Sequence, residues 1–257
     1  MAVDQIQLND RFIEYRWVAG AGSDAADLVM LHEGLGSMAL WKDFPERLAR
    51  ATGCRVLAYS RHGHGASSVL REPRAVDYMH DEAQIWLPLL LQGLGVRRPI
   101  LFGHSDGASI ALIYAALSSS ELRGVVALAP HVRVEDLTIN GIRAAREAYQ
   151  NTDFARRLAL YHGDVDATFW GWNNIWLDPA FRQWSIEAQL PSIRCPVMGI
   201  QGREDEYGTL EQMEMIQRAV HQSELLVLDN CRHSPHRDHP EAVLAASARF
   251  IIGLNTP

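Results

Sequence analysis

The stretch FGHSDGAS, residues 102–109, decides how the rest of the chain is interpreted. Its residues Gly103 to Gly107 form the pattern G-x-S-x-G, directly after the apolar run RPILFGHS and directly before the helical pattern ASIALIYAAL. A serine at the apex of a sharp strand-to-helix turn is held in a strained backbone conformation, and flanking glycines leave room for that turn. The following helix places backbone N–H groups beside the serine. The pattern predicts that Ser105 is a nucleophile; the simpler alternative is a serine that caps an ordinary helix.

Short apolar runs alternate with amphipathic helical patterns along most of the chain. The segments IQL and RFIEYRWV flank an Asn-Asp turn and predict an antiparallel hairpin. Six further runs have the composition of central strands covered on both faces, at residues 27–32, 54–60, 98–105, 122–130, 195–202 and 224–230. Helical patterns cover residues 38–51, 77–94, 105–118, 209–221 and 240–252. This alternation predicts an α/β fold with a mostly parallel, doubly wound sheet.

Residues 132–190 interrupt this alternation, because they contain helical patterns and loops but no convincing strand. The interval carries Trp170, Trp172, Trp176 and Trp184. A helical insertion between two strands of an α/β sheet commonly lies over the carboxyl edge, where such sheets bind ligands. We therefore predict a core of residues 1–131 and 191–257 and a helical cap of residues 132–190, with the tryptophans in the substrate pocket. The alternative is a helical subdomain whose own small core takes up about half of these tryptophans.

With these elements in place, the chain resembles the α/β-hydrolase superfamily over essentially its whole length. The loop MLHEGLGSMALW, residues 30–41, is similar to the family's His-Gly-x loop, although Glu33 stands where the family usually has Gly. The resemblance implies a nucleophile after the fifth strand, a cap after the sixth, an acid after the seventh and a histidine after the eighth. It also implies an oxyanion hole formed by the backbone N–H of Asp106 and that of Gly34 or Leu35, depending on how the loops are aligned.

The loop GIQGREDEYGT, residues 199–209, follows the seventh predicted strand and supplies the acid. The family places an Asp three residues after a Gly that ends this strand, and Asp205 has this spacing from Gly202. Its carboxylate is expected to accept the Nδ1–H of the histidine, fix the tautomer and stabilise the imidazolium. The rival position is Glu135 or Asp136, after the sixth strand, where some relatives keep their acid.

The stretch CRHSPHRDHP, residues 231–240, holds three evenly spaced histidines. The resemblance assigns the base to His233, which follows the nucleophile and the acid in the chain order expected for this fold. Zinc binding by all three histidines needs a converging geometry, and Pro235 disfavours the continuous helix that would give it. We therefore expect no metal, and expect His236 and His239 at the surface or at the start of the last helix.

These residues together predict acyl transfer without a metal or cofactor. His233 takes the proton of Ser105, the serine oxygen attacks a carbonyl, and water later releases the acyl group. The tryptophans, with His32 and His104 as further pocket candidates, favour a small apolar or aromatic carboxylic ester or lactone. The simpler role of His32 is a buried imidazole that ties loops together.

Other reactions compete with ester hydrolysis on the same residues. A carbon–carbon bond hydrolase acting on a vinylogous diketone, a thioesterase and a small-molecule receptor with a vestigial site remain alternatives. The serine nucleophile argues against haloalkane dehalogenase and epoxide hydrolase chemistry, because those relatives need Asp at that position. The absence of His-Gly-Gly-Pro-Gly argues against a proline iminopeptidase.

The composition narrows the classes of partner. The 257 residues carry a formal net charge of -7, so no global basic field exists to hold nucleic acid or an anionic membrane. The first residues lack the apolar segment of a signal peptide, and the longest apolar stretches are too short to span a bilayer. Cys54, Cys195 and Cys231 are scattered and odd in number, which favours a reducing, cytoplasmic setting. A small-molecule substrate is the expected partner, and the oligomeric state stays open.

Overall fold

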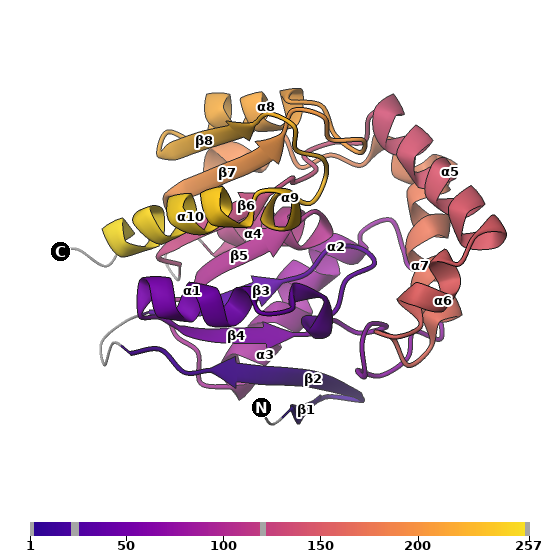
Figure 1. The fold of residues 1–257 in the computed structure, drawn as a ribbon, viewed down its shortest axis with the longest axis horizontal. Coiled ribbons are helices and arrows are strands. Elements are labelled where there is room, and N and C mark those ends of the chain that lie inside the picture. The colour runs from indigo at the N-terminus through magenta and orange to yellow at the C-terminus, as the bar shows by residue number, and fades with distance from the viewer. Residues whose placement is uncertain (1–2, 22–25, 119–121, 255–257) are drawn as a thin grey trace.

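The computed structural model describes residues 3–21, 26–118 and 122–254 and shows a layered α/β architecture (Figure 1). Within these residues the centre is an eight-stranded sheet in the order β1-β2-β4-β3-β5-β6-β7-β8. The strands are β1 (Asp4–Leu8), β2 (Arg11–Val18), β3 (Asp27–Leu31), β4 (Arg55–Tyr59), β5 (Ile100–His104), β6 (Gly124–Leu128), β7 (Val197–Gly202) and β8 (Ser223–Leu228). β2 pairs antiparallel with β1 and β4, and all later pairings are parallel. The predicted mostly parallel sheet is confirmed.

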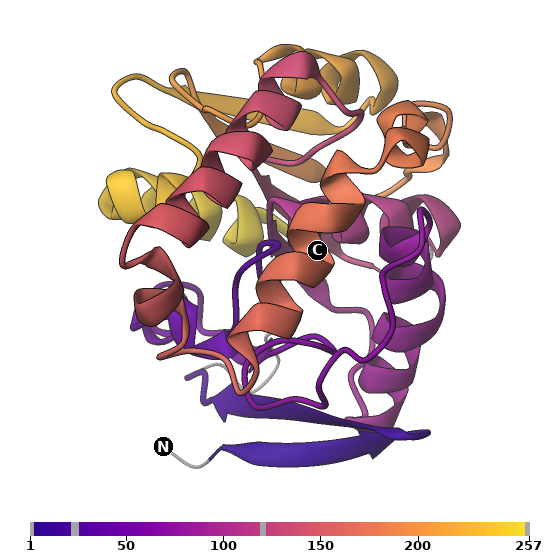
Figure 2. The same cartoon turned by 90° about the vertical axis from the view of Figure 1, so that its right-hand side faces the viewer.

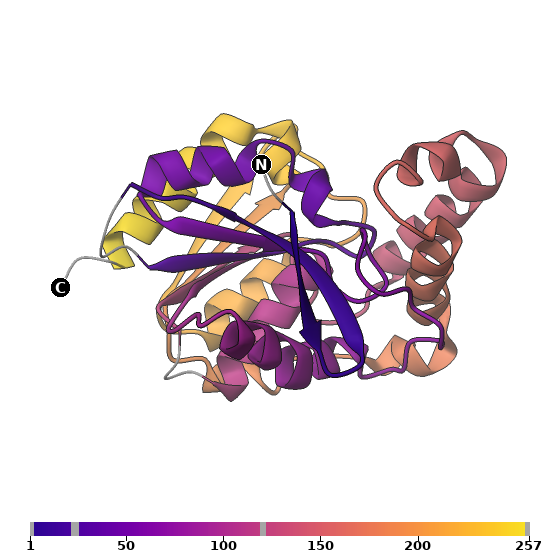
Figure 3. The same cartoon turned by 90° about the horizontal axis from the view of Figure 1, so that it is seen from below.

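Helices cover both faces of this sheet. They are α1 (Phe44–Thr52), α2 (Tyr78–Asp81), α3 (Leu87–Gly93), α4 (Asp106–Leu117), α5 (Asp136–Asn151), α6 (Phe154–Leu158), α7 (Val165–Leu177), α8 (Glu211–Ala219), α9 (Pro235–Asp238) and α10 (Pro240–Leu254). Shorter turns are η1 (Met38–Trp41), η2 (Glu82–Trp86), η4 (Pro179–Gln183) and η5 (Leu190–Ser192). Figure 3 shows α1 and α10 on one face of the sheet, and α3, α4 and α8 on the other.

The central strands are apolar on both faces because helices cover both. In β3, Leu28 and Met30 pack in the core beneath α1 and α10, whereas Val29 and Leu31 pack in the core on the opposite face. All four side chains are fully buried. Side chains alternate along a strand, so a strand between two helical layers has no solvent-facing position.

Two predicted helices are divided in the structure. The pattern at 38–51 becomes η1 and α1, because Lys42 adopts a left-handed φ of 55° between them and Pro45 lies in the first turn of α1. The pattern at 77–94 becomes α2, the π-helical turn η2 and α3. Pro88 has no N–H to donate to the preceding turn, and a π-helical turn accommodates such an interruption.

Residues 132–190 contain α5, α6, α7 and η4, and the only β-structure described there is an isolated bridge between Arg133 and Ser185. Figure 1 shows α5, α6 and α7 beyond the carboxyl ends of the parallel strands, and Figure 2 shows α5 and α7 crossing in front of that edge. Among the described helices, none combines the length and apolar character needed to cross a bilayer.

Candidate active site

Ser105 lies at the apex of the turn between β5 and α4, with φ 53° and ψ -119°. This left-handed conformation is strained for a residue with a side chain. The two flanking glycines are required by space: a Cβ on Gly103 would lie 2.4 Å from the carbonyl oxygen of Gly107, and one on Gly107 would lie 2.1 Å from that of Leu31. The Ser105 N–H donates to Leu128 O on β6 at 2.9 Å. The turn is therefore fixed to the neighbouring strand.

Three side chains from separate loops meet at this turn. The Oγ of Ser105 lies 2.9 Å from Nε2 of His233, in the loop after β8. The Nδ1 of His233 lies 2.8 Å and 3.0 Å from the two carboxylate oxygens of Asp205, in the loop after β7. Asp205 is itself held by the N–H of Tyr207 at 2.8 Å, and its other oxygen accepts from Gln201 at 3.3 Å. The structure thus brings together the three residues that the sequence selected.

The rival acids lie elsewhere. Glu135 accepts hydrogen bonds from the N–H and the hydroxyl of Thr209, at 2.8 Å and 2.6 Å. Asp136 is paired with Arg182. Of the three candidate acids, Asp205 is therefore the one whose carboxylate contacts His233.

The charged groups around His233 raise its pKa. Burial by itself lowers the pKa of His233, but the charge and hydrogen bond of Asp205 and the charge of Glu206 outweigh it, so the pKa is raised. For Asp205, burial raises the pKa, and the positive charge and hydrogen bond of His233 reverse this and hold it below its ordinary value. The pair is thus arranged to stabilise an imidazolium beside a carboxylate.

The loop that contains Gly34 and Leu35 is held by side chains that the sequence analysis did not select. The Nη2 of Arg61 donates to His32 O at 3.2 Å and to Glu33 O at 3.0 Å. The ring of His64 bonds to Gly34 O at 3.0 Å, and the ring of His162 bonds to Leu35 O at 3.1 Å. Within the described chain, the N–H groups of Gly34 and Leu35 donate to no backbone carbonyl. The loop is therefore fixed through its carbonyls, with both amides left free.

Gly34 is also required by space, because a Cβ there would lie 2.2 Å from Nε1 of Trp172. His32 is fully buried, accepts the N–H of Arg61 on Nε2 at 3.0 Å, and lies 2.7 Å from Glu33 O through Nδ1. The structure therefore places His32 beneath the loop as a buried brace, the simpler of the two roles considered for it. Trp172 is the predicted pocket residue that lies directly against the loop.

The carboxylate of Asp106 points away from Ser105 and is buried. Its Oδ2 accepts the hydroxyl of Tyr78 at 2.7 Å and lies 3.9 Å from Nη2 of Arg61. Its Oδ1 has no hydrogen-bond partner in the described chain. The Asp106 N–H begins α4, directly after the turn. The side chain is thus tied to the residues behind the loop, and its backbone amide remains at the helix start.

His236 corrects one expectation: it lies in the first turn of α9, a short helix before the last one, and it is buried rather than at the surface or at the start of the last helix. Its ring lies 4.8 Å from the ring of Trp41 and 4.9 Å from that of His104, centroid to centroid. The ring of His104 bonds in turn to His233 O at 2.7 Å. Burial lowers the pKa of His236 well below its ordinary value, so the ring is neutral. His239 is half-buried before α10, with Nε2 3.0 Å from Asn230 O.

The three histidines of this loop therefore point to different partners. In the part of the chain that the structure describes, no group of three or more His, Cys, Asp or Glu side chains is arranged to hold a metal ion. Arg232, the unusual residue before His233, is exposed and pairs with Glu206 at 3.2 Å. Its charge is therefore engaged at the surface.

The remaining tryptophans divide between the site and the helices. The ring of Trp176 lies 4.8 Å from the ring of His131, which lies 5.8 Å from that of His233. Trp184 packs against Phe181 at 5.5 Å, further from the triad. Trp170 packs on α5, against Tyr149 at 5.7 Å. The structure thus brings Trp172 and Trp176 to the site, while Trp184 and Trp170 pack among the helices.

His131 is a site residue that the sequence analysis missed. It follows β6, and Ser109 of α4 clamps its backbone, donating to His131 O at 2.7 Å and accepting from its N–H at 2.9 Å. Burial lowers the pKa of His131 to about 4, with the positive charge of His233 adding to the effect. The ring is therefore neutral beside His233. A histidine directly after a strand end was the available signal.

A model of the alpha/beta hydrolase family matches residues 28–246, so the chain belongs to this family. It is 29% identical over 132 residues to the proline iminopeptidase of Lactobacillus delbrueckii subsp. lactis, an alignment covering 48% of this chain but only 43% of that protein. It is 24% identical over 280 residues to the proline iminopeptidase of Levilactobacillus brevis, covering 92% of each. The enol-lactonase from Burkholderia xenovorans LB400 superposes with a TM-score of 0.76 at 18% identity, over 96% of this chain and 99% of that one. This likeness confirms the predicted fold.

Proposed function

We propose that the protein hydrolyses a small, apolar or aromatic carboxylic ester or lactone through an acyl-enzyme on Ser105. The observation that carries this proposal is the continuous line of contacts from Ser105 Oγ to His233 to Asp205, at 2.9 Å and 2.8 Å. A hydroxyl in contact with a neutral imidazole that a carboxylate orients is the arrangement needed for nucleophilic acyl transfer. In this proposal residues 132–190 form a cap over the site, and the three buried cysteines, which form no disulfide, suit a reducing cytoplasm.

The reaction follows from the positions of the groups. His233 Nε2 accepts the proton of Ser105 as Oγ attacks the carbonyl carbon, and Asp205 stabilises the imidazolium that forms. The developing oxyanion is held by the N–H of Asp106 and by that of Gly34 or Leu35. His233 then donates its proton to the leaving alcohol, and water attacks the acyl-enzyme by the same proton route.

The polarity of the site supports an uncharged substrate. The rings next to the site are apolar or neutral: Trp172 and Trp176 are buried beside it, and the buried ring of His131 is neutral. Charged groups nearby already have partners: Glu33 pairs with Arg237 at 3.2 Å, and Asp106 binds Tyr78. Burial of an unpaired charged substrate group would require a free counter-ion.

The second candidate is an aminopeptidase that releases N-terminal proline, favoured by the full-length likeness to the proline iminopeptidase of Levilactobacillus brevis. Such a substrate carries an ammonium group and requires a carboxylate to bind it. Because Glu33 is shared between Arg237 and His104, and Asp106 is bound by Tyr78, we favour the ester.

A substrate panel on the wild type and Ser105→Ala tests the proposal. The panel holds p-nitrophenyl butyrate, an aromatic ester, a lactone, a thioester, a vinylogous diketone and proline p-nitroanilide. We expect sustained turnover of esters or lactones that Ser105→Ala abolishes. Full activity in Ser105→Ala would overturn the nucleophile. Faster turnover of the proline anilide than of any ester would assign the second candidate, and preference for the thioester or diketone would replace the substrate class.

A further inference from the structure

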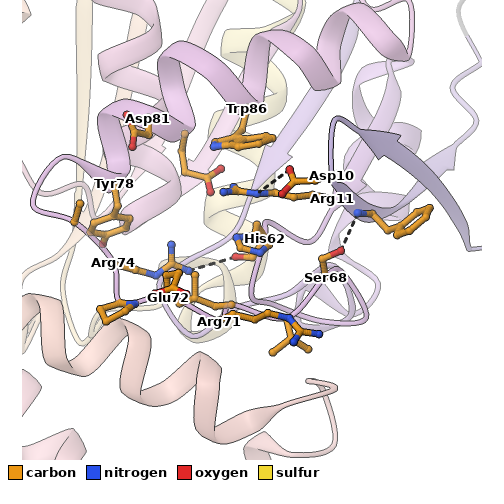
Figure 4. A pocket seen from close by; sticks show the side chains of 16 residues that line it. Asp10, Arg11, His62, Ser68, Arg71, Glu72, Arg74, Tyr78, Asp81 and Trp86 are labelled. Atoms are coloured by element: carbon orange, nitrogen blue, oxygen red, sulfur yellow. Dashed lines mark hydrogen bonds and ion pairs between the residues drawn. The ribbon is translucent and has the colours of Figure 1, made fainter.

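A cavity of about 740 Å³ lies away from the triad (Figure 4). It is bounded by the start of β2, by the loop between β4 and α2, and by α2 and η2. Ser105, Asp205 and His233 are not among its lining residues. Its size lies within the range of small-molecule sites, about 300–1,000 Å³.

Three arginines line this cavity, and the guanidinium groups of two of them, Arg11 and Arg74, rest on aromatic rings. The guanidinium carbon of Arg11 lies 3.6 Å from the ring centre of Trp86, and that of Arg74 lies 5.0 Å from the ring centre of Tyr78. Figure 4 shows the two guanidiniums on either side of His62. Stacking fixes the plane of a guanidinium and leaves its N–H edge available for an acceptor.

Most of these N–H donors are unused in the described chain. The hydrogen bond of Arg74 is a long one, 3.4 Å from Nη2 to His62 O. The carboxylate nearest to Arg11 is that of Asp10, at 4.0 Å, and this side chain is 85% exposed. Burial lowers the pKa of Arg74, with the charge of Arg61 adding to it, as expected for a cation without a close counter-ion.

Acidic and basic side chains both line the floor of the cavity. Burial, and then the charges of Arg11 and Arg74, lower the pKa of His62 to about 4. Glu72 is exposed at the rim. Glu82 is buried, which raises its pKa, and the largest opposing influence is Arg61, which is not a lining residue. The charges of Arg74 and Arg11 also lower the pKa of Glu82, so this acid feels both arginines. Among the described residues, however, no carboxylate forms an ion pair with Arg74, and the one nearest to Arg11 is that of Asp10 at 4.0 Å.

We propose that this cavity is an accessory binding site for an organic carboxylate with a small apolar or aromatic body, held by Arg11 and Arg74. The two guanidiniums offer donor edges that match a planar carboxylate. Phe12, Leu70 and Pro73 line the walls and provide apolar surface for the body of the ligand, which a simple inorganic anion would leave uncovered. The proposal is independent of the reaction at Ser105.

The site is connected to the nucleophile turn through one residue. The ring of Tyr78 lies under Arg74, and its hydroxyl binds the carboxylate of Asp106, the residue after Ser105. A carboxylate bound to Arg74 is therefore separated from the hydrogen bond between Tyr78 and Asp106 by one side chain, that of Tyr78.

The test compares benzoate with its neutral isostere benzamide and with inorganic phosphate, by calorimetric titration of the whole protein. We expect benzoate to bind the wild type about tenfold or more tighter than benzamide, because the charge-assisted bonds are lost in the amide. The double variant Arg11→Gln/Arg74→Gln should weaken benzoate by about tenfold or more. The matched control is Arg156→Gln, an 84% exposed arginine on α6, which should bind benzoate as the wild type does.

Three results would overturn the proposal. Equal binding of benzamide and benzoate by the wild type would remove the role of charge, and this comparison needs no variant to fold. Unchanged benzoate affinity in the double variant would place the acid elsewhere, such as the pocket at Ser105. If phosphate bound as tightly as benzoate, the cavity would be a general anion site, and its apolar walls would not contribute to affinity.

Discussion

Asp205→Asn removes the charge opposite His233 while the surrounding hydrogen bonds still favour the same side-chain position. The oxygen of the amide remains where the N–H groups of Tyr207 and Gly208 donate to Oδ1, at 2.8 Å and 3.3 Å. The amide NH₂ then replaces Oδ2, which lies 3.0 Å from Nδ1 of His233. The retained oxygen still lies 2.8 Å from Nδ1, so one acceptor for the Nδ1–H remains, and the new NH₂ faces the Gln201 amide that donated to Oδ2. The substitution therefore removes the carboxylate charge and leaves one hydrogen bond to the imidazole.

The size of the effect follows from the separation of the charges. An imidazolium and a carboxylate whose charge centres lie about 4 Å apart interact by about 4 kcal/mol at an effective dielectric constant of about 20. Since about 1.4 kcal/mol is a factor of ten in rate, kcat should fall by about 10³-fold. The KM should change little, because Asp205 contacts the base rather than the substrate in the proposed mechanism.

The dependence of kcat/KM on pH gives an independent reading. The raised pKa of His233 places the acid limb of the wild-type profile above about pH 6.5, since the base acts only when neutral. In Asp205→Asn, burial still lowers the pKa and the largest opposing influence is gone, so the acid limb should move to lower pH. Glu206→Gln is the matched control, because Glu206 also raises this pKa but contacts the backbone N–H of His233. A loss below about tenfold with an unmoved acid limb would refute the assignment of Asp205.

Three further outcomes are expected. Gly34→Ala should lower kcat by about 10²-fold in the ester assay, because the added Cβ would lie 2.2 Å from Nε1 of Trp172 and displace the loop. A wild-type rate in this variant would place the oxyanion donor elsewhere. His236→Phe should keep turnover and should raise the free energy of unfolding, measured by denaturant titration, by about 1 kcal/mol. The reason is that both ring nitrogens of His236 are buried without partners in the described chain. A large loss of turnover would contradict this. Acid should destabilise the fold, because several buried histidines have a lower pKa in the folded state than in the unfolded chain. The free energy of unfolding should therefore be largest above about pH 6.5 and fall as the pH is lowered below it. A free energy of unfolding that stays constant between pH 7.5 and 5 would contradict this. The histidines responsible are His32, His64, His131 and His236.

The parts of the site that could be predicted from the sequence lie in short contiguous motifs. The nucleophile turn needs glycine at positions 103 and 107, each two residues from Ser105, so its sequence signature is contained in five residues. Asp205 and His233 lie in the loops that follow β7 and β8, and parallel strands bring those ends to one edge of the sheet. Chain order and the strand pattern were therefore sufficient to bring the three residues together.

The supports of the site could not be predicted in this way, because they depend on contacts between distant segments. The loop at Gly34 is held by Arg61, His64 and His162, whose partners lie from 28 to 127 positions away in the chain. Each of these side chains, taken alone in the sequence, resembles an ordinary loop residue. His131 is similar, because only the packing of α7 brings Trp176 against it.

The three histidines after β8 lie close together in the chain but have different structural positions. Pro235 begins α9, so His233 remains in the loop, where its ring reaches Ser105 and Asp205. His236 falls inside the first turn of α9, and its ring enters the core beside Trp41. Because His236 also packs on His104, which bonds to the carbonyl of His233, its bulk supports the backbone of the proposed base. Truncation of His236 should therefore disturb the base through lost packing, which is why an aromatic replacement is the cleaner comparison with His233→Ala.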